Sequence, residues 1–312
     1  MTFGDADISF FEVIEILSGK QSNQESWSYI VEYRLNRTLA AIFGGGALAV
    51  SGLLLQVFFR NPLAGPGVLG ITSGASLGVA IIILGGIAVE GIFSGVSMIL
   101  SGIIGALVVL LILLFVSKFV KNQVTLLVIG LMFGYFTGAF VNMLFLWADQ
   151  GETREFVIWG LGSFEGLSSS SIMLFIVVIA TFLALTVFLV KGMNALVLGE
   201  DYVRSLGVNL KTLRILLIII TSVLAAIVTV HCGPISFIGI AVPQLIRAIG
   251  KSRNHAVLIP LCFLGGGFLG LIADVLVRMS NNSLPLNTVT ALIGAPIIIW
   301  TIIKMNRKFV GM

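Results

Sequence analysis

Long apolar runs, separated by short clusters of polar residues, make up most of the chain. A helix needs roughly 20 mostly apolar residues to cross a hydrocarbon core of about 30 Å, so runs of that length predict membrane-spanning helices. Nine such windows lie at 38–59, 68–89, 92–117, 124–147, 170–190, 213–231, 236–250, 257–277 and 287–303. The seventh window is short and contains Pro243 and Gln244, which at membrane depth require cover by protein or a water-filled cavity.

Composition agrees with a membrane location. Of the 312 residues, 58% are hydrophobic and only 10% are charged, and the mean hydropathy is +1.12, outside the range of soluble domains. The predicted fold class is therefore all-α, a polytopic helical membrane protein. The longest polar stretch predicts an external N-terminal segment at 1–37, followed by a single transmembrane domain at 38–312. A net charge of +4 without a long basic run argues against a nucleic-acid partner.

The distribution of basic residues predicts the orientation, because Lys and Arg favour cytoplasmic loops. A cytoplasmic C-terminus with Lys304 and Arg307 places Arg60, Lys118 and the loop at 191–214 on the same side. Nine spans then leave the acidic N-terminus outside, without a signal peptide to export it. We therefore expect that a first span is missing from this chain or that its start is misassigned.

The segment RNPLAGPGVLGITSGASLG at 60–78 has two interpretations. Its glycines could form a phosphate-binding loop, but such a loop follows a strand and carries a lysine beside Ser or Thr, and neither is present. The four-residue spacing of Gly70, Gly74 and Gly78 instead predicts a smooth strip on a helix, where another backbone packs closely. The residues before this strip are expected to form a tight corner at the inner surface: Arg60, Asn61 and Pro62.

The sequence contains no pattern that indicates catalysis. Ser/His/Asp sets, paired carboxylates and a G-x-x-x-x-G-K-[ST] loop are absent, and His231 and His255 fall on opposite predicted faces of the membrane. An intramembrane enzyme is therefore the weaker hypothesis, and an ion channel is weaker still, since no filter-like run is visible. His231 and Cys232 could form a metal pair, but without further ligands helix packing is the favoured interpretation, as it is for Cys262.

Asp274 is the one acidic residue well inside an apolar run. A carboxylate at the middle of the bilayer costs about 2.5 to 3.5 kcal/mol on insertion scales, so it requires a partner or a place near the outer end of its helix. One interpretation is a proton relay. Because no second intramembrane acid could receive the proton, we favour a structural hydrogen-bonding role that orients the Arg278 end of the helix.

Four segments share a pattern with a known family of membrane proteins. They are RLNRTLAAIFGGGALAVSGLLLQVFFRNPLAGPGVLGITSGASLG (34–78), MNALVLGEDYVRSLGVNLKTLR (193–214), GPISFIGIAVPQLIRAIGKSRNHAVLIPLCFLGGGFLGLIADVLVRM (233–279) and SLPLNTVTALIGAPIIIW (283–300). Together they resemble the signature of the FecCD-type permeases, the membrane subunits of ABC importers for iron–siderophore complexes, haem and cobalamin. The resemblance implies a type II ABC importer permease fold, usually of ten spans. Three residues depart from the family pattern of proline, histidine and glycine: Asn36, Gln244 and Asn287.

The resemblance implies a transport subunit rather than an enzyme. Such permeases work as homodimers in the inner or plasma membrane of prokaryotes, with two cytoplasmic ATPase subunits and an external or periplasmic substrate-binding protein. ATP and Mg would bind to the ATPase partner, and no cofactor is expected in this chain. The expected cargo is a ferric siderophore, with haem or cobalamin as the alternative.

The predicted inner loop at 191–214 contains a short amphipathic helix, because Leu198, Tyr202 and Leu206 recur every fourth residue. This helix could lie at the lipid boundary. The resemblance instead implies that it inserts into a groove on the ATPase and transmits the closure of that subunit. The residues assigned to coupling are Gly199, Glu200, Asp201, Tyr202, Arg204, Leu206 and Gly207.

Arg34, Arg37 and Arg278 are cations at the predicted outer surface, against the positive-inside trend. Lipid phosphate or pairing with Glu32 and the acidic tail could explain them. The resemblance implies a third role, in which these arginines receive acidic residues of the binding protein.

The same resemblance implies a pathway between two copies of the chain. Expected lining comes from the fourth window and from an outer re-entrant stretch at 156–167. The residues assigned to the pathway are Asn142, Met143, Trp159, Gly160 and Ser163.

Overall fold

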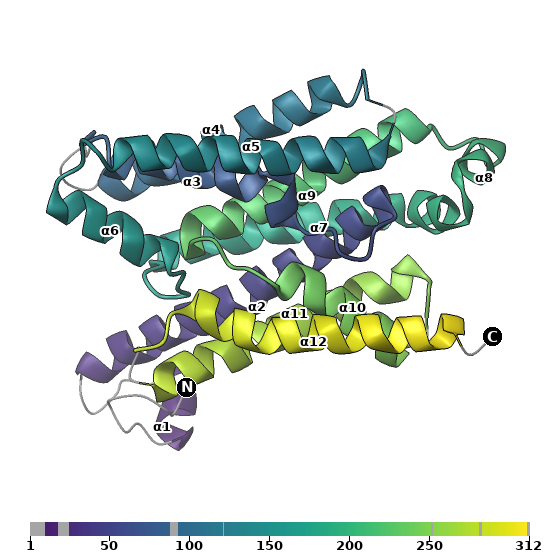
Figure 1. Ribbon diagram of the computed structural model, residues 1–312. Helices are drawn as coiled ribbons and strands as arrows, with labels where there is room; N and C mark the ends of the chain where they lie inside the picture. The colour runs from purple at the N-terminus through teal and green to yellow at the C-terminus, as the bar shows by residue number, and fades with distance from the viewer. Residues whose placement is uncertain are drawn as a thin grey trace.

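The chain folds into a bundle of helices in the computed structural model, which describes residues 10–17, 25–87, 93–120, 122–250, 252–280 and 283–310 (Figure 1). Within these ranges no strand occurs, so the predicted all-α class is confirmed. The elements are α1 (Phe10–Leu17), α2 (Glu25–Phe59), the 3-10 turn η1 (Pro66–Leu69), α3 (Ile71–Ile83), α4 (Phe93–Val116), α5 (Gln123–Leu144), α6 (Gln150–Gly160), α7 (Ser169–Leu198), α8 (Glu200–Ser205), α9 (Leu210–Cys232), α10 (Ile238–Gly250), α11 (His255–Met279) and α12 (Leu286–Val310).

Each of the nine predicted windows contains an apolar helix. In the described part of the chain, six helices are long and apolar enough to cross a membrane: α2, α4, α5, α7, α9 and α11. Three further apolar helices, α3, α10 and the apolar part of α12, are shorter. The windows therefore located the helices correctly, and six of the nine hold a described helix of full spanning length.

Three helices have other boundaries than the predicted windows. The helix expected at 38–59 begins at Glu25, so residues 25–37 of the predicted polar segment belong to the same helix. The helix expected to end at 190 continues to Leu198, and the one expected to end at 89 finishes at Ile83. Polar residues at 25–37 and at 191–198 did not stop a helix, and the apolar residues after Ile83 did not extend one, where Gly86 has a φ of 61°.

α2 is the central helix of the bundle. Its apolar window is 78% buried, the highest share among the long helices, and it packs most extensively against α11 and α9. Close approach to α11 and α10 depends on glycine. A Cβ atom at Gly45 would overlap the carbonyl oxygen of Gly266, and one at Gly52 would overlap that of Gly239. In lipid, such close packing replaces the hydrophobic effect as a source of helix association.

The predicted glycine strip of residues 70–78 is confirmed as a packing surface. A Cβ atom at Gly74 would lie 2.7 Å from the carbonyl oxygen of Gly105, and one at Gly78 would overlap that of Ser101. Both contacts join α3 to α4. Gly70 has a φ of 71°, a conformation that favours glycine, at the junction of η1 and α3.

Pro243 lies inside α10, a helix of 13 residues. The expected protein cover is present, because Val242, Pro243 and Gln244 are all buried. α10 packs between α2, α11 and α12. A short helix with a proline is thus accommodated inside the protein rather than against lipid.

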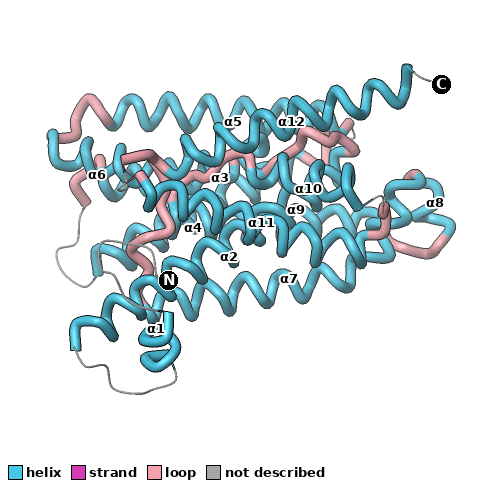
Figure 2. Tube along the Cα trace, turned by 90° about the horizontal axis from the view of Figure 1, so that it is seen from below, coloured by secondary structure: helices cyan, strands magenta, loops and turns pink. Residues whose placement is uncertain are grey.

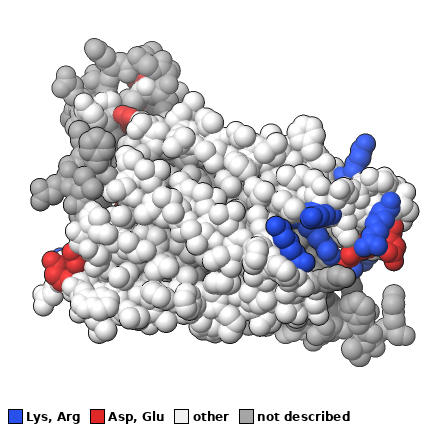
Figure 3. Space-filling view, turned by 90° about the horizontal axis from the view of Figure 1, so that it is seen from above, with Lys and Arg blue, Asp and Glu red and all other residues white. Residues whose placement is uncertain are grey.

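On the face seen in Figure 3, charged side chains gather at the two ends of the bundle, and the surface between them is almost free of charge. We call the two ends the α8 end and the α6 end, after the short helix that lies at each (Figure 1). Lys and Arg cluster at the α8 end (Figure 3). This distribution agrees with the predicted orientation, in which the α8 end faces the cytoplasm.

Candidate functional site

The coupling segment predicted at 191–214 is shorter in the structure. α7 continues to Leu198 and α9 begins at Leu210, so only the residues between these two positions leave the long helices. Gly199 has a φ of 131° and Gly207 has a φ of 72°, at either end of α8. Other residues rarely adopt these conformations, so the two glycines set where the chain turns into and out of α8.

One face of α8 is buried and the other is exposed. Val203 is fully buried, whereas Tyr202 and Leu206 are 47% and 55% exposed. Asp201 and Arg204 are exposed as well. An aromatic ring, an aliphatic side chain and two charged groups are therefore exposed at the end of the bundle. Such a mixed surface is typical of a site that binds another protein.

Ion pairs join α8 to the rest of the bundle. Arg214 of α9 donates a hydrogen bond of 2.7 Å to Glu200 Oε1, and Arg60 lies 3.7 Å from the same oxygen. Glu200 therefore connects α8 to α9 and to the residue that follows α2. Sequence reasoning placed Glu200 and Arg60 in different motifs, and it did not select Arg214.

The inner corner after α2 has the expected tight geometry. Arg60 has a positive φ of 47°, and the Asn61 side-chain oxygen accepts a hydrogen bond of 2.9 Å from the Leu63 amide. Gln244 of α10 donates a hydrogen bond of 2.6 Å to the Pro62 carbonyl. The corner is thus held from within and from α10, and the glycines around it pack helices rather than bind phosphate.

Gln56 strengthens this corner and was not selected from the sequence. Its Oε1 accepts a hydrogen bond of 2.8 Å from Arg247, and its Nε2 donates one of 3.4 Å to the Ile240 carbonyl. A glutamine in an otherwise apolar span was a signal that could have identified it, since buried polar groups need partners.

At the α6 end, four charged residues form the outer ionic cluster: Arg37, Glu165, Asp274 and Arg278. Asp274 accepts a hydrogen bond of 2.6 Å from Arg37 Nε through one oxygen and lies 2.7 Å from Arg278 through the other. Arg37 also pairs with Glu165 in the loop after α6. Asp274 therefore has one partner on its own helix, Arg278, and a second partner on α2, which agrees with the structural hydrogen-bonding role expected for it.

The expected surface position of two arginines is wrong. Arg34 is 6% exposed and Arg37 is 5% exposed, and Arg278 is bound to Asp274. Arg37 is buried because Asp274 and Glu165, which lie far away in the sequence, meet it at the α6 end. Docking of a binding protein onto these side chains stays a prediction, and it would require the outer ionic cluster to open.

The stretch at 156–167, which was expected to be re-entrant, contains the end of α6 and the loop that follows it. Asp149 and Glu152 form a capping box that begins α6. Trp159 Nε1 donates a hydrogen bond of 3.4 Å to the Val230 carbonyl, and the Ser163 amide donates one of 2.9 Å to the Cys232 carbonyl. The stretch is therefore fixed to the end of α9. Gly160 has open space beside it.

The expected pathway residues of α5 lie on an exposed face. Asn142 is exposed and Met143 is 49% exposed, and the apolar window of α5 is only 17% buried. α5 and α12 lie on the same side of the molecule in Figure 2, and Figure 1 shows that they are separated across that side. This side could face a second copy or lipid, so lining of a pathway by Asn142, Met143, Trp159, Gly160 and Ser163 stays a prediction.

The contacts of His231 and Cys232 support packing. His231 Nδ1 lies 2.9 Å from the Ile227 carbonyl oxygen, and its ring is 5.5 Å from that of Phe175. Cys232 is buried. In the part of the chain that the structure describes, no group of three or more His, Cys, Asp and Glu could hold a metal ion. His255 lies at the other end of the bundle from His231, where its Nδ1 contacts the Asn194 side chain.

Each of the three departures from the family pattern makes a hydrogen bond. Asn36 donates to Ser169 Oγ at 3.0 Å, and the Asn287 side chain accepts from the Ser236 amide at 3.1 Å. Gln244 donates to the inner corner, as described above. All three amides therefore connect segments that are distant in the sequence, from positions inside α2, at the start of α12 and inside α10.

Taken together, the membrane-spanning bundle and the short helix between glycines at its charged end define an ABC importer permease. A family model supports this class, because the FecCD transport family matches residues 1–304. The chain belongs to the FecCD transport family. As a permease it is a transport subunit, and ATP hydrolysis takes place in a partner.

Curated relatives cover most of the chain. The vitamin B12 import system permease protein BtuC of Klebsiella pneumoniae is 34% identical over 283 residues, which are 90% of this chain and 84% of the relative. The BtuC of Salmonella typhi is 35% identical over 282 residues, 89% of this chain and 85% of the relative.

Two solved structures share the fold. One is described as an inward-facing conformation of a metal-chelate type ABC transporter. It is 30% identical, with a TM-score of 0.83, and the match covers 94% of this chain and 95% of that one. The other is PsaBC from Streptococcus pneumoniae in complex with Fab. It is 15% identical with a TM-score of 0.57 over 93% and 95% of the two chains, which indicates a shared fold alone.

Proposed function

We propose that this chain is the permease subunit of an importer for a bulky metal chelate, with a corrinoid such as vitamin B12 as the first candidate cargo. The similarity to BtuC over 89–90% of the chain carries the proposal, since it includes the segments that form the bundle. A ferric siderophore, the cargo expected from the sequence, is the second candidate, and haem is a third. The similarity to a metal-chelate type transporter is compatible with each.

In the proposed assembly, two copies of the chain meet along the side that contains α5 and α12 (Figure 2). α5 has large exposed side chains at Met132, Tyr135 and Phe136, and α12 has them at Leu292 and Ile299. A second copy would bury part of this surface and leave a pathway along the two-fold axis. Weak contacts with mostly apolar walls suit a bulky cargo, because tight binding would slow its release.

Two ATPase subunits are proposed to bind at the α8 end and a substrate-binding protein at the α6 end. ATP and Mg would bind only to the ATPase. Its closure would move α8 through the exposed Tyr202 and Leu206, and Glu200 would transmit the movement to α2 and α9. The assembly would lie in the inner or plasma membrane of a prokaryote, where the α8 end is cytoplasmic.

Transport by reconstituted vesicles tests the proposal. The purified permease, its ATPase and its binding protein are placed in proteoliposomes, and uptake of radiolabelled cyanocobalamin is compared with that of a labelled ferric siderophore. ATP-dependent accumulation of the corrinoid, with no ATPase activity from the permease alone, is the expected result. Accumulation of the siderophore alone would select the second candidate. If the assembled complex hydrolyses ATP rapidly but the vesicles accumulate no corrinoid, no ferric siderophore and no haem, the proposed function is refuted.

A further inference from the structure

Hydrogen bonds join the end of α7 to the start of α11 at the α8 end of the bundle. Asn194 Oδ1 accepts two of them from His255: one of 2.9 Å from the backbone amide and one of 2.7 Å from Nδ1. Because an amide oxygen can only accept, Nδ1 of His255 carries the proton. Asn194 Nδ2 donates a third hydrogen bond, of 2.9 Å, to Asn254 Oδ1. We call these three residues the α7–α11 junction.

The start of α11 depends on this junction. The first N–H groups of a helix have no partner within the helix itself. Asn254 accepts a hydrogen bond of 3.0 Å from the Ala256 amide, and the His255 amide donates to Asn194, which belongs to another helix. Pro260 lies about one turn further along α11 and has no N–H to donate to the Ala256 carbonyl. The first turn of α11 is therefore held by α7 as well as by its own helix.

The residues on both sides of the junction are firmly packed. His255 is 1% exposed, and two neighbours of Asn194 on α7, Met193 and Leu196, are fully buried. Separation of the two helices would leave the His255 amide and Nδ1 without their partner in a buried place, which costs more than the loss of an exposed hydrogen bond. The end of α7 and the first turn of α11 are therefore expected to move together.

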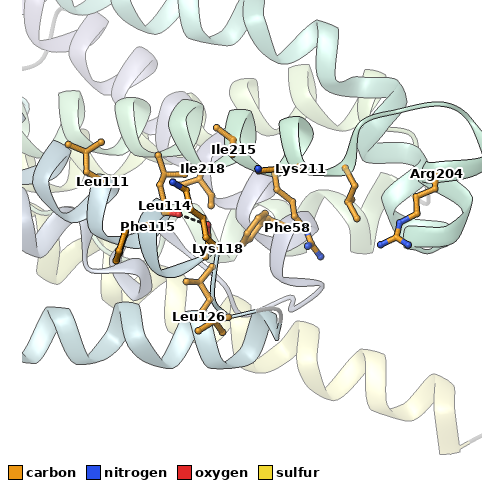
Figure 4. Close-up of a pocket in the computed structure, with 14 residues that line it drawn as sticks. Phe58, Leu111, Leu114, Phe115, Lys118, Leu126, Arg204, Lys211, Ile215 and Ile218 are labelled. Atoms are coloured by element: carbon orange, nitrogen blue, oxygen red, sulfur yellow. Dashed lines mark hydrogen bonds between the residues drawn. The ribbon is translucent and has the colours of Figure 1, made fainter.

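α7 leads directly into α8. Asn194 lies about one helical turn before Leu198, where α7 ends, and Gly199 then begins the turn into α8. α8 itself lies beyond the start of α9, and Figure 4 shows Arg204 of α8 past Lys211 of α9. A displacement of α8 would thus reach the end of α7 through the backbone.

We propose that Asn194 and His255 are positioning residues, which carry the movement of α8 through the end of α7 into α11. The inference rests on the proposed function, because it assumes that an ATPase moves α8. It adds a second connection to the one through Glu200, which joins α8 to α9 and to the residue after α2. Asp274 and Arg278 lie near the other end of α11, about 28 Å from His255 along the helix. The second connection would therefore lead to the outer ionic cluster.

Hydrogen exchange of the assembled complex tests the proposal without any cargo. The permease with its ATPase in nanodiscs is compared before and after trapping with ATP and vanadate, and exchange is measured in peptides that cover 197–208 and 252–260. In the parent, trapping should change exchange in both peptides. In Asn194→Ala and in His255→Leu, the change at 197–208 should remain. The change at 252–260 should fall by about fivefold, the factor that one typical hydrogen bond contributes.

Two variants serve as controls. His255→Asn should retain most of the change at 252–260, since asparagine can place an N–H donor close to the position of Nδ1. Asn122→Ala is the matched control, because Asn122 caps α5 by accepting a hydrogen bond of 2.9 Å from the Val124 amide. It removes an asparagine cap away from the junction and should leave both changes as in the parent.

The outcomes separate this inference from the proposed function. A change confined to 197–208 in the parent would overturn the inference and leave the coupling role of α8 intact. If Asn194→Ala lowers the temperature of unfolding but keeps the full change at 252–260, the junction only stabilises the bundle, and the inference is overturned as well. If trapping changes neither peptide, the movement of α8 in the proposed function is refuted, and the inference with it.

Discussion

The outer ionic cluster yields a stability prediction that depends on burial. Asp274→Asn keeps the shape of the side chain but removes the charge that Arg37 and Arg278 share. The Asp274 and Arg37 side chains are 4% and 6% exposed, so both are buried. Removal of one member of a buried ion pair typically costs about 3–5 kcal/mol, because the remaining charge is left without a partner. After Asp274→Asn, Arg278 would lose its ion pair, whereas Arg37 would keep the one with Glu165.

Reversible unfolding of the purified chain in mixed micelles measures the free energy of unfolding. Glu165→Gln is the matched control, because Glu165 binds the same arginine but its side chain is 32% exposed, and exposed pairs contribute about 0–1 kcal/mol. In the double variant Asp274→Asn/Arg278→Met, one unpaired charge is gone and part of the lost stability should return. If Asp274→Asn and Glu165→Gln lower the free energy of unfolding equally, or if Arg278→Met restores nothing, the argument from buried charge is refuted.

Two further predictions concern coupling and packing. Glu200→Gln weakens the link of α8 to the bundle, so ATPase activity stimulated by loaded binding protein should fall several-fold. Lys191→Gln changes an exposed charge of α7 outside the residues assigned to coupling and should alter this activity little. Equal activity in both variants would argue against the link. Gly45→Ala should lower the free energy of unfolding by about 1–3 kcal/mol, because the added methyl group overlaps Gly266. Gly138→Ala is the control and should leave this free energy unchanged or raise it, because there is open space beside Gly138. A larger loss in Gly138→Ala than in Gly45→Ala, measured in the same unfolding assay, would contradict the prediction.

Helices and close contacts could be predicted from the sequence because their signals are local. Apolar runs located every long helix, and the spacing of Gly70, Gly74 and Gly78 indicated a packing strip that α4 occupies. The glycines around α8 were likewise visible, since they occur on both sides of a short amphipathic segment. Each of these features depends on neighbours within a few residues or on a periodic pattern.

The ends of helices and the partners of charges were harder to predict. α7 passes the expected end at 190 because Lys191 is exposed at the α8 end, where a long side chain reaches water without ending the helix. Arg37 was expected at the surface, but Asp274 and Glu165 bind it from segments more than 100 residues away. Pairing over such distances depends on the three-dimensional arrangement, and one sequence does not contain it.

α2 physically connects the two ends of the permease. Arg37 joins it to α11 and to the loop after α6, and about 33 Å away along the helix the corner at Arg60 meets Glu200 of α8. Between these points α2 contacts α11 and α10 through glycines that bring backbones close, and the Gln56 side chain forms hydrogen bonds with α10. A helix held by ion pairs at its ends and by close contacts along its length can move only as a rigid body together with its neighbours. Movement of α8 would therefore change the outer ionic cluster, and Glu200→Gln and Asp274→Asn should show non-additive effects on stimulated ATPase activity.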